Sequence, residues 1–161
     1  MQKYAFIDRD GTLIFEPQDS FQIDSLEKLK ILDGVIDGLN KLNSLGYKLI
    51  MVSNQNGVGS ESFPQQTFEI PHNKMIEIFK DNGIVFDKIF VCPHLPSANC
   101  DCRKPKTGLV DDFLAESDID KNLSIMIGDR ETDRTFANNI GVSYVKMDLN
   151  GDFFEAVKHL N

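Results

Sequence analysis

Asp8 and Asp10 are the residues of this chain best suited to do chemistry, because two carboxylates stand two positions apart where the apolar run Tyr4-Ala5-Phe6-Ile7 ends. Side chains at positions i and i+2 of an extended segment point to the same side. One carboxylate can then act as a nucleophile while the other donates or accepts a proton. The Gly-Thr pair that follows permits a sharp turn and offers a hydroxyl. The alternative interpretation is a strand followed by an ordinary Asp-Gly turn.

Three further polar segments occur at places where they could join these carboxylates. Ser53-Asn54-Gln55 follows one apolar run, Arg103-Lys104-Pro105 lies in mid-chain, and Gly128-Asp129-Arg130-Glu131-Thr132-Asp133 follows another apolar run. Open α/β sheets gather their ligands at the carboxyl ends of their strands, so we expect these segments to meet there. In isolation, the serine segment could be a turn and the lysine a solvated side chain, so their roles depend on one another.

Cys92, His94, Cys100 and Cys102 form a second group, with the pattern Cys-x-His-x5-Cys-x-Cys. Three thiolates and one imidazole match a closed tetrahedral Zn²⁺ site, which is structural because no position is open for water. Ordering this loop costs roughly 10–20 kcal/mol, comparable with the free energy of structural zinc binding. The alternatives are buried free cysteines with a chance histidine, or a redox pair.

Short apolar runs that alternate with segments of helical period predict an α/β fold with a parallel sheet. We expect strands over 3–7, 48–53, 88–92, 124–127 and 143–146. Apolar residues at helical spacing predict two helices that end before Gly46 and Gly83. Further helices are expected over 108–116, 132–140 and 153–161, and a long loop over 61–71, which contains two prolines.

The bulk composition predicts one domain over 1–161, because the chain suffices for one core and is too short for two full domains. A net charge of −8 argues against nucleic acid and anionic membranes as partners. No apolar run approaches the length of a membrane span, and the first residues lead into a strand rather than a signal peptide. We therefore expect a soluble, cytoplasmic protein.

In their order, the four polar segments resemble the signature of the haloacid dehalogenase superfamily of phosphatases. The resemblance implies a Rossmann-like sheet with helices on both faces, the strand before Asp8 in its middle, and phosphate carried on Asp8. It also implies catalytic Mg²⁺ bound by Asp8, Asp129 and the backbone carbonyl of Asp10. The superfamily often inserts a large cap domain, for which this chain has no space.

Within that resemblance the chemistry of each side chain predicts its role. Asp8 is the expected nucleophile, Lys104 the residue that stabilises its phosphorylated form, and Asp133 the residue that orients Lys104 or metal-bound water. We expect Ser53, Asn54, Gln55 and Arg103 to contact the phosphoryl group, the substrate or the neighbouring loop.

Asp10 is the expected general acid and base. The expected site holds four carboxylates and three positive charges, two from Mg²⁺ and one from Lys104, so one added proton would bring the set to neutrality. The carboxylates are those of Asp8, Asp10, Asp129 and Asp133. Because crowded carboxylates raise one another's proton affinity, we predict that Asp10 enters the cycle protonated.

The segments around Asp8, Ser62-Phe63-Pro64-Gln65, Pro71-His72-Asn73 and Cys92-Pro93-His94-Leu95-Pro96 resemble the histidinol-phosphatase domain of bifunctional histidine-biosynthesis proteins. This resemblance implies hydrolysis of L-histidinol phosphate. Glu16 could then pair with the substrate ammonium and Phe21 could pack on its imidazole. The same family commonly continues into a dehydratase domain, so the chain is either a stand-alone phosphatase or one domain of a longer protein.

Two alternatives remain at this point. The heptose bisphosphate phosphatases of the same superfamily share the catalytic segments and a comparable zinc loop. A signalling receiver domain also combines Mg²⁺ with a phosphorylated aspartate, a hydroxyl and a lysine. Its phosphoacceptor would follow a strand near mid-chain, and it would lack an acid at the position of Asp10.

Overall fold

A five-stranded parallel sheet forms the centre of the structure, a computed structural model that describes all 161 residues. The strands are β1 (Tyr4–Ile7), β2 (Lys48–Asn54), β3 (Lys88–Cys92), β4 (Ile125–Gly128) and β5 (Ser143–Lys146). Their order across the sheet is β3-β2-β1-β4-β5, and each neighbouring pair is parallel. The expected strands and the central place of β1 are therefore confirmed.

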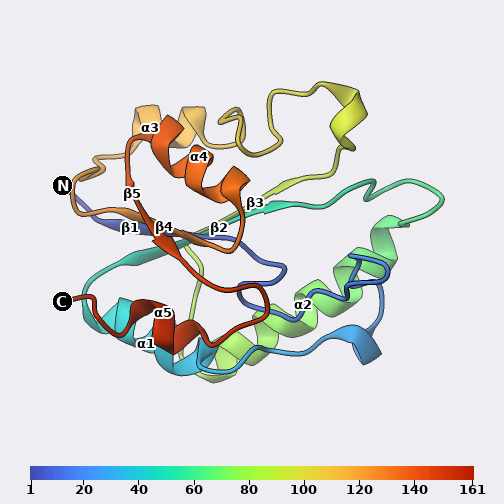
Figure 1. Cartoon of the computed structure of the whole chain (residues 1–161), viewed down its shortest axis with the longest axis horizontal. Helices are drawn as coiled ribbons and strands as arrows, with labels where there is room; N and C mark the ends of the chain where they lie inside the picture. Colours follow the sequence, from blue (N-terminus) through green and yellow to red (C-terminus); the bar gives the residue numbers. More distant parts are fainter.

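Helices cover both faces of this sheet, as predicted. On one face lie α1 (Val35–Ser44), α2 (Gln65–Asp81) and α5 (Phe153–Val157), and on the other lie α3 (Asp111–Glu116) and α4 (Glu131–Ile140) (Figure 1). Two 3-10 turns, η1 (Leu26–Lys28) and η2 (Pro96–Ala98), complete the elements. No helix combines the length and the apolar character needed to cross a membrane.

The alternation of side chains along β1 divides the core into two layers. Ala5 and Ile7 belong to the cluster that packs against α1, α2 and α5, whereas Tyr4 and Phe6 belong to the cluster that packs against α4. All four residues of β1 are buried. A strand that is buried on both faces must be apolar throughout, which explains the unbroken apolar run from Tyr4 to Ile7.

The predicted loop over 61–71 is wrong in its second half. Helix α2 begins at Gln65, and Pro71 lies inside it. The prolines suggested a loop because proline has no amide hydrogen for the helical ladder. However, Phe68, His72, Met75 and Phe79 form a buried stripe at helical spacing, and their burial stabilises the helix through the proline. Helices α3 and α5 are shorter than predicted.

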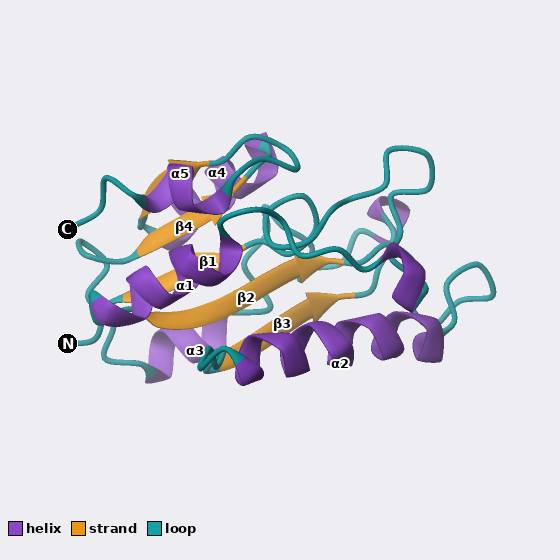
Figure 2. Ribbon diagram, turned by 90° about the horizontal axis from the view of Figure 1, so that it is seen from below, coloured by secondary structure: helices purple, strands orange, loops and turns teal.

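All five strands end at the same edge of the sheet, because they are parallel. Figure 2 shows the arrowheads of β2 and β3 pointing toward the long loops at that edge. Strands β1, β2, β3 and β4 are followed there by Asp8, Gln55, Pro93 and Asp129. The topology thus brings together polar segments that are far apart in the sequence.

The contact between α1 and α5 supplies a test of the packing. A Cβ atom on Gly38 would lie 2.4 Å from Cδ1 of Phe153 and 3.3 Å from Cγ2 of Val157. Overpacking outweighs the helix propensity of alanine, so Gly38→Ala should lower the free energy of unfolding by about 1–2 kcal/mol in urea denaturation. Asn40→Ala, at an exposed position of the same helix, is the control and should not destabilise. Equal stability of both variants would contradict the close packing.

Candidate active site

The turn that follows β1 places Asp8 and Asp10 at the end of the central strand. The Asp8 amide donates to the Ile127 carbonyl at 3.0 Å, which continues the pairing with β4. Gly11 then adopts φ +81°, and a Cβ atom there would lie 2.6 Å from Cδ1 of Leu149. This turn therefore requires glycine. Both carboxylates are almost completely buried, with 7% and 8% of these residues exposed.

Lys104 lies at the centre of the buried charges. Its Nζ donates to Oδ1 of Asp8 and Oδ1 of Asp133, both at 2.8 Å, and to the Val52 carbonyl at 2.7 Å. Burial acts to raise the pKa of Asp8, but the charge and hydrogen bond of Lys104 outweigh it, so this pKa lies below its ordinary value. Asp8 is therefore ionised, as the predicted nucleophile must be.

Asn54 holds the loop that carries Lys104. Its side-chain amide donates to the Lys104 carbonyl at 3.1 Å, and its Oδ1 accepts from the Lys104 amide at 2.9 Å. Of the two contacts expected for Asn54, substrate or neighbouring loop, the structure shows the loop. This paired contact fixes the backbone of a mid-chain segment against the end of β2, so the ammonium can reach Asp8.

Asp10 is held at both carboxylate oxygens. Oδ1 accepts from Nη1 of Arg9, and Oδ2 accepts from Nε2 of Gln55, each at 2.9 Å. Nε2 of Gln55 also lies 2.7 Å from the Ser53 hydroxyl. The structure therefore brings Ser53 and Gln55 into the site as expected, with Gln55 against the carboxylate of Asp10.

The pKa of Asp10 is raised, in the predicted direction but for a different main reason. Burial is the largest cause, and the charge of Asp8 adds to it, while Arg9 and Gln55 act to lower the pKa. The charge count made from the sequence omitted the guanidinium of Arg9. With it, neutrality of the site no longer requires a proton, and desolvation carries the argument instead.

Asp8 and Asp129 form an oxygen site suited to a divalent cation. The carboxylate oxygens of Asp8, Asp129 and Asp133 lie within 4.8 Å of one another. The Thr12 hydroxyl bridges the first two, 2.9 Å from Oδ1 of Asp129 and 3.4 Å from Oδ2 of Asp8. Burial and the charge of Asp8 raise the pKa of Asp129 to about 8. A cation such as Mg²⁺ between these acids would relieve their repulsion, so the donor set fits.

Asp133 makes different contacts from these two acids. One of its oxygens accepts from Lys104, and the other accepts from the Arg130 amide at 3.2 Å. A Cβ atom on Gly128 would lie 2.3 Å from Oδ2 of Asp133, so only glycine leaves room for this carboxylate. Of the two roles expected for Asp133, orientation of Lys104 or of metal-bound water, these contacts favour the orientation of Lys104.

Cys92, His94, Cys100 and Cys102 converge in one cluster, as the sequence predicted. Most of their donor atoms are separated by 3.1–3.6 Å, near the roughly 3.5–3.8 Å expected around a tetrahedral zinc ion. Sγ of Cys102 and Cys92 are closer, at 2.6 Å, and neither forms a disulfide. Burial and the neighbouring thiols raise the pKa of Cys102 to about 12. Three thiolates this close need a cation, so the donor set fits zinc.

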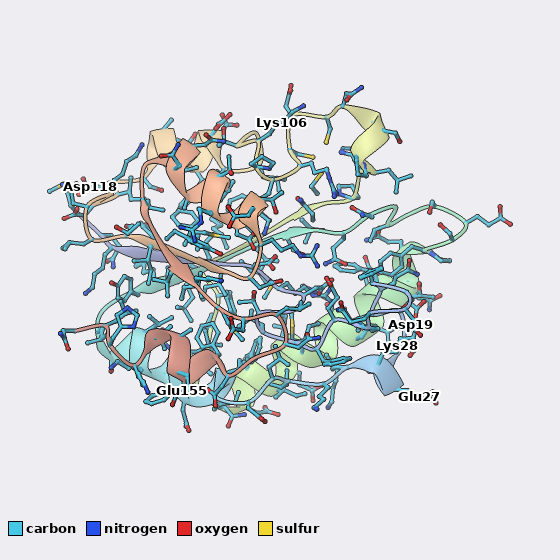
Figure 3. The ribbon with its side chains drawn as sticks, viewed as in Figure 1. Asp19, Glu27, Lys28, Lys106, Asp118 and Glu155 are labelled. Atoms are coloured by element: carbon cyan, nitrogen blue, oxygen red, sulfur yellow. The ribbon has the colours of Figure 1, made fainter.

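The zinc loop, residues 92–102, borders the entrance to the site. Arg103 follows it directly and bonds to Oδ1 of Asn56, while Nζ of Lys106 donates to the Cys100 carbonyl at 2.8 Å. A cavity of about 540 Å³ lies beside this loop and is lined by Arg103, Lys104, Lys106 and Arg130. Lys106, labelled in Figure 3, lies on the same side of the sheet as α3 and α4.

A second cavity, of about 250 Å³, opens over Asp10 and holds the residues proposed for specificity. Glu16 and Phe21 line it, together with Arg103 and Arg130. The Glu16 carboxylate is buried and forms an ion pair with the Arg130 guanidinium. Phe21 lies on the rim with 60% of its surface exposed. The sequence analysis did not foresee Arg130 as the partner of Glu16, because the two are 114 residues apart.

Comparisons with known proteins agree with this geometry. The sequence profile of the family described as polynucleotide kinase 3 phosphatase matches residues 3–148. The histidine biosynthesis bifunctional protein HisB of Legionella pneumophila (strain Lens) is 52% identical over 145 residues, 90% of this chain and 41% of that protein. HisB of Blochmanniella floridana is 54% identical over 144 residues, 89% of this chain and 40% of that protein. The chain thus spans about two fifths of the length of these relatives.

A solved structure shares the fold. The D,D-heptose 1.7-bisphosphate phosphatase from B. bronchiseptica, complexed with magnesium and phosphate, superposes with a TM-score of 0.82 and 26% identity. The match covers 98% of this chain and 86% of the other. A phosphatase that binds magnesium and phosphate is therefore built on the same framework.

Removal of metal from the zinc loop should lower catalysis without touching the reacting groups. Arg103 and Lys104 follow Cys102 directly, so a disordered loop frees the segment that places the Lys104 ammonium. Cys100→Ser, or chelation followed by resupply of Mg²⁺ alone, should reduce kcat about tenfold or more. Zinc content by elemental analysis and phosphate release are the two measurements. Full activity in a demonstrably zinc-free protein would overturn this link.

Proposed function

Because this chain belongs to the polynucleotide kinase 3 phosphatase family, we propose that it hydrolyses a phosphate monoester through phosphorylated Asp8, and that the ester is L-histidinol phosphate. The similarity to bifunctional histidine-biosynthesis proteins over 90% of the chain carries the choice of substrate. The contacts of Asp8, Asp10 and Lys104 support the choice of mechanism. The reaction would serve histidine biosynthesis in the cytoplasm.

In the first half-reaction, Asp8 attacks phosphorus and the bond to the ester oxygen breaks. Mg²⁺, held by Asp8, Asp129 and the backbone carbonyl of Asp10, would supply positive charge to the phosphoryl oxygens. Lys104 provides a further positive charge from its position beside Asp8, and the Ser53 hydroxyl donates to a phosphoryl oxygen. Asp10 gives its proton to the leaving oxygen, so histidinol departs as a neutral alcohol at that position.

In the second half-reaction, water attacks phosphorus and the bond to Asp8 breaks. Asp10, now ionised, accepts a proton from that water and returns to its starting state. Asp8 leaves as a carboxylate, which the Lys104 ammonium stabilises at 2.8 Å. Inorganic phosphate is the second product. The raised pKa of Asp10 and the lowered pKa of Asp8 support this division of roles.

Glu16 and Arg130 support recognition of a substrate that carries a positive ammonium group and a negative phosphate group. Their ion pair lies over the carboxylates of the site, and Arg130 also lies 3.6 Å from Oδ2 of Asp129. We assign the substrate ammonium to Glu16, and its imidazole to Phe21 at the rim. Arg103, which also lines this cavity, contacts the phosphate as it enters.

Other phosphatase substrates have weaker support. The heptose bisphosphate phosphatase shares the fold at 26% identity, well below the 52% of the histidine-biosynthesis relatives. The family description names polynucleotides, but a chain with a net charge of −8 repels a polyanion. A receiver domain is set aside, because the family is one of phosphatases and Asp10 stands where such a domain has no acid.

Two structural proposals accompany this function. Zn²⁺ at Cys92, His94, Cys100 and Cys102 is structural, since all four positions of a tetrahedral site are taken by the protein. Residues 1–161 form one phosphatase domain. The relatives that it matches are described as bifunctional and are longer, and we assign to their further length the dehydratase domain that the resemblance implies. The chain itself covers 41% of such a relative.

Phosphate release from L-histidinol phosphate tests the proposal. The wild-type chain with Mg²⁺ should turn over this ester with a kcat/KM at least about tenfold above that for heptose 1,7-bisphosphate or a 3'-phosphorylated oligonucleotide. Asp8→Asn should abolish turnover, and Asp10→Asn should lower kcat about 10²–10⁴-fold while substrate binding persists. A preference for either competing ester would replace the substrate, and near-normal kcat in Asp10→Asn would reject the proton donor.

Glu16→Gln tests the recognition of the ammonium group. Loss of the contact between Glu16 and the substrate ammonium should raise KM for histidinol phosphate about tenfold. KM for an alkyl phosphate that has no ammonium group should stay within about twofold of its wild-type value. Glu131→Gln is the control, because this exposed carboxylate lies beside Arg130 in sequence without pairing with it. Equal changes in KM for the two esters would remove Glu16 from this role.

A further inference from the structure

The Arg9 guanidinium is fully buried beside the site, yet the proposed chemistry does not use it. Arg9 stands between the two catalytic carboxylates in the sequence, and its side chain reaches toward α2. Its Cζ lies 4.9 Å from the ring centre of Phe68, which belongs to that helix. A charged side chain with no exposed surface is rare unless it is paired, so its contacts call for a reason.

One contact of Arg9 reaches a reacting group. Nη1 donates to Oδ1 of Asp10 at 2.9 Å, while Gln55 occupies Oδ2 from the other side at the same distance. The carboxylate of Asp10 is therefore clamped at both oxygens. Proton transfer requires the donor within hydrogen-bond reach of the leaving oxygen, so this clamp determines whether Asp10 can act.

The Arg9 guanidinium also lies over the ring of Phe68, which belongs to a stack of aromatic rings at the start of α2. The Phe68 ring lies parallel to the His72 imidazole, with centres 5.0 Å apart and an angle of 24° between the planes. Phe63 packs against the edge of Phe68 at 6.0 Å. Burial and the charge of Arg9 lower the pKa of His72 to about 4, so the imidazole is neutral near pH 7. The stack thus supports the guanidinium without adding a second charge.

Packing alone does not explain an arginine at this position. Nε and Nη2 of Arg9, with Nδ1 of His72, are the buried side-chain nitrogens that have no hydrogen-bond partner in the chain. An unsatisfied buried polar group costs about 1–3 kcal/mol. A methionine would fill a similar space and avoid that cost. Arginine at this position therefore lowers the stability of the fold, so the reason for its presence is not packing.

We propose that Arg9 is a positioning residue: it fixes the Asp10 carboxylate for proton transfer to the leaving oxygen, and Phe68 and His72 hold Arg9 in place. The inference rests on the proposed function, in which Asp10 is the proton donor. It makes α2 part of the catalytic machinery, although this helix does not supply a reacting group.

Two esters with different leaving groups separate positioning from a structural role. An alkyl alkoxide needs a proton to leave, whereas the phenolate of p-nitrophenyl phosphate does not. Arg9→Met should therefore lower kcat/KM for histidinol phosphate about 10–100-fold, and that for p-nitrophenyl phosphate less than about threefold. Arg9→Lys keeps a donor for Asp10 and should give a value between those of wild type and Arg9→Met. A structural defect would instead lower kcat/KM for both esters by the same factor.

A matched pair of variants in α2 tests the ring stack. Phe68→Leu should lower the ratio of alkyl to aryl kcat/KM about three- to tenfold, because Arg9 loses its support. Phe79→Leu removes the same atoms from a buried position of the same helix, where the ring packs against Phe86 away from the site. It should destabilise the fold comparably and leave that ratio unchanged. If Arg9→Met does not fold, the comparison of Phe68→Leu with Phe79→Leu still tests the positioning role of Arg9.

The outcomes separate this inference from the proposed function. An unchanged ratio in Arg9→Met and Phe68→Leu, or an equal change in Phe68→Leu and Phe79→Leu, would overturn the positioning role. If histidinol phosphate is not hydrolysed but another alkyl phosphate is, the proposed substrate fails. The ratio of kcat/KM for that alkyl phosphate to kcat/KM for p-nitrophenyl phosphate then tests the role of Arg9.

Discussion

The ion pairs of one buried ammonium organise this structure. Nζ of Lys104 lies within 2.8 Å of both Asp8 and Asp133, and 97% of this lysine is removed from solvent. A buried charge without such partners would be strongly destabilising, and each acid would be costly without the lysine. The three groups therefore depend on one another. The end of β1, the start of α4 and the mid-chain loop must all be correctly placed before the site is stable.

The rest of the fold serves to place these three groups. Parallel strands deliver Asp8 and Asp129 to one edge, and the Asn54 side chain joins the lysine loop to the end of β2. The cluster of Cys92, His94, Cys100 and Cys102 lies directly before Arg103 and Lys104, so a zinc ion held there would limit the freedom of the same loop. On the other side of the sheet, α2 brings rings beneath Arg9. The contacts that hold the buried charges in place are thus also the contacts that position the predicted catalytic groups.

Much of this arrangement was predictable from the sequence because its signals are local. Apolar runs indicated each strand, and the spacing of cysteines and histidine indicated a metal cluster. The family resemblance implied only the central place of β1. The full strand order was not predicted, since apolar runs of similar length carry no information on which strands are neighbours. Proline concealed the first turns of α2, where burial of Phe68 and His72 outweighs a missing hydrogen bond.

The contacts that the sequence concealed join distant residues. Arg130 and Glu16 meet only after folding, and so do Arg9 and Phe68. Local patterns cannot reveal such partners. The charge count of the site was incomplete for another reason: Arg9 is adjacent to Asp10 in the sequence, but the sequence does not show that its guanidinium turns toward that carboxylate. The direction of the shift in the pKa of Asp10 was nonetheless foreseen, because burial and carboxylate repulsion act in the same sense.

The central claim is that phosphorus is transiently bonded to Asp8 during turnover. The direct measurement is acid quench of the protein during steady hydrolysis of a phosphorus-labelled ester, followed by mass spectrometry of its peptides. We predict label on Asp8, at a level that rises when the second half-reaction is slowed. Rapid release of phosphate with no label at Asp8, or with label on another residue, would contradict the account.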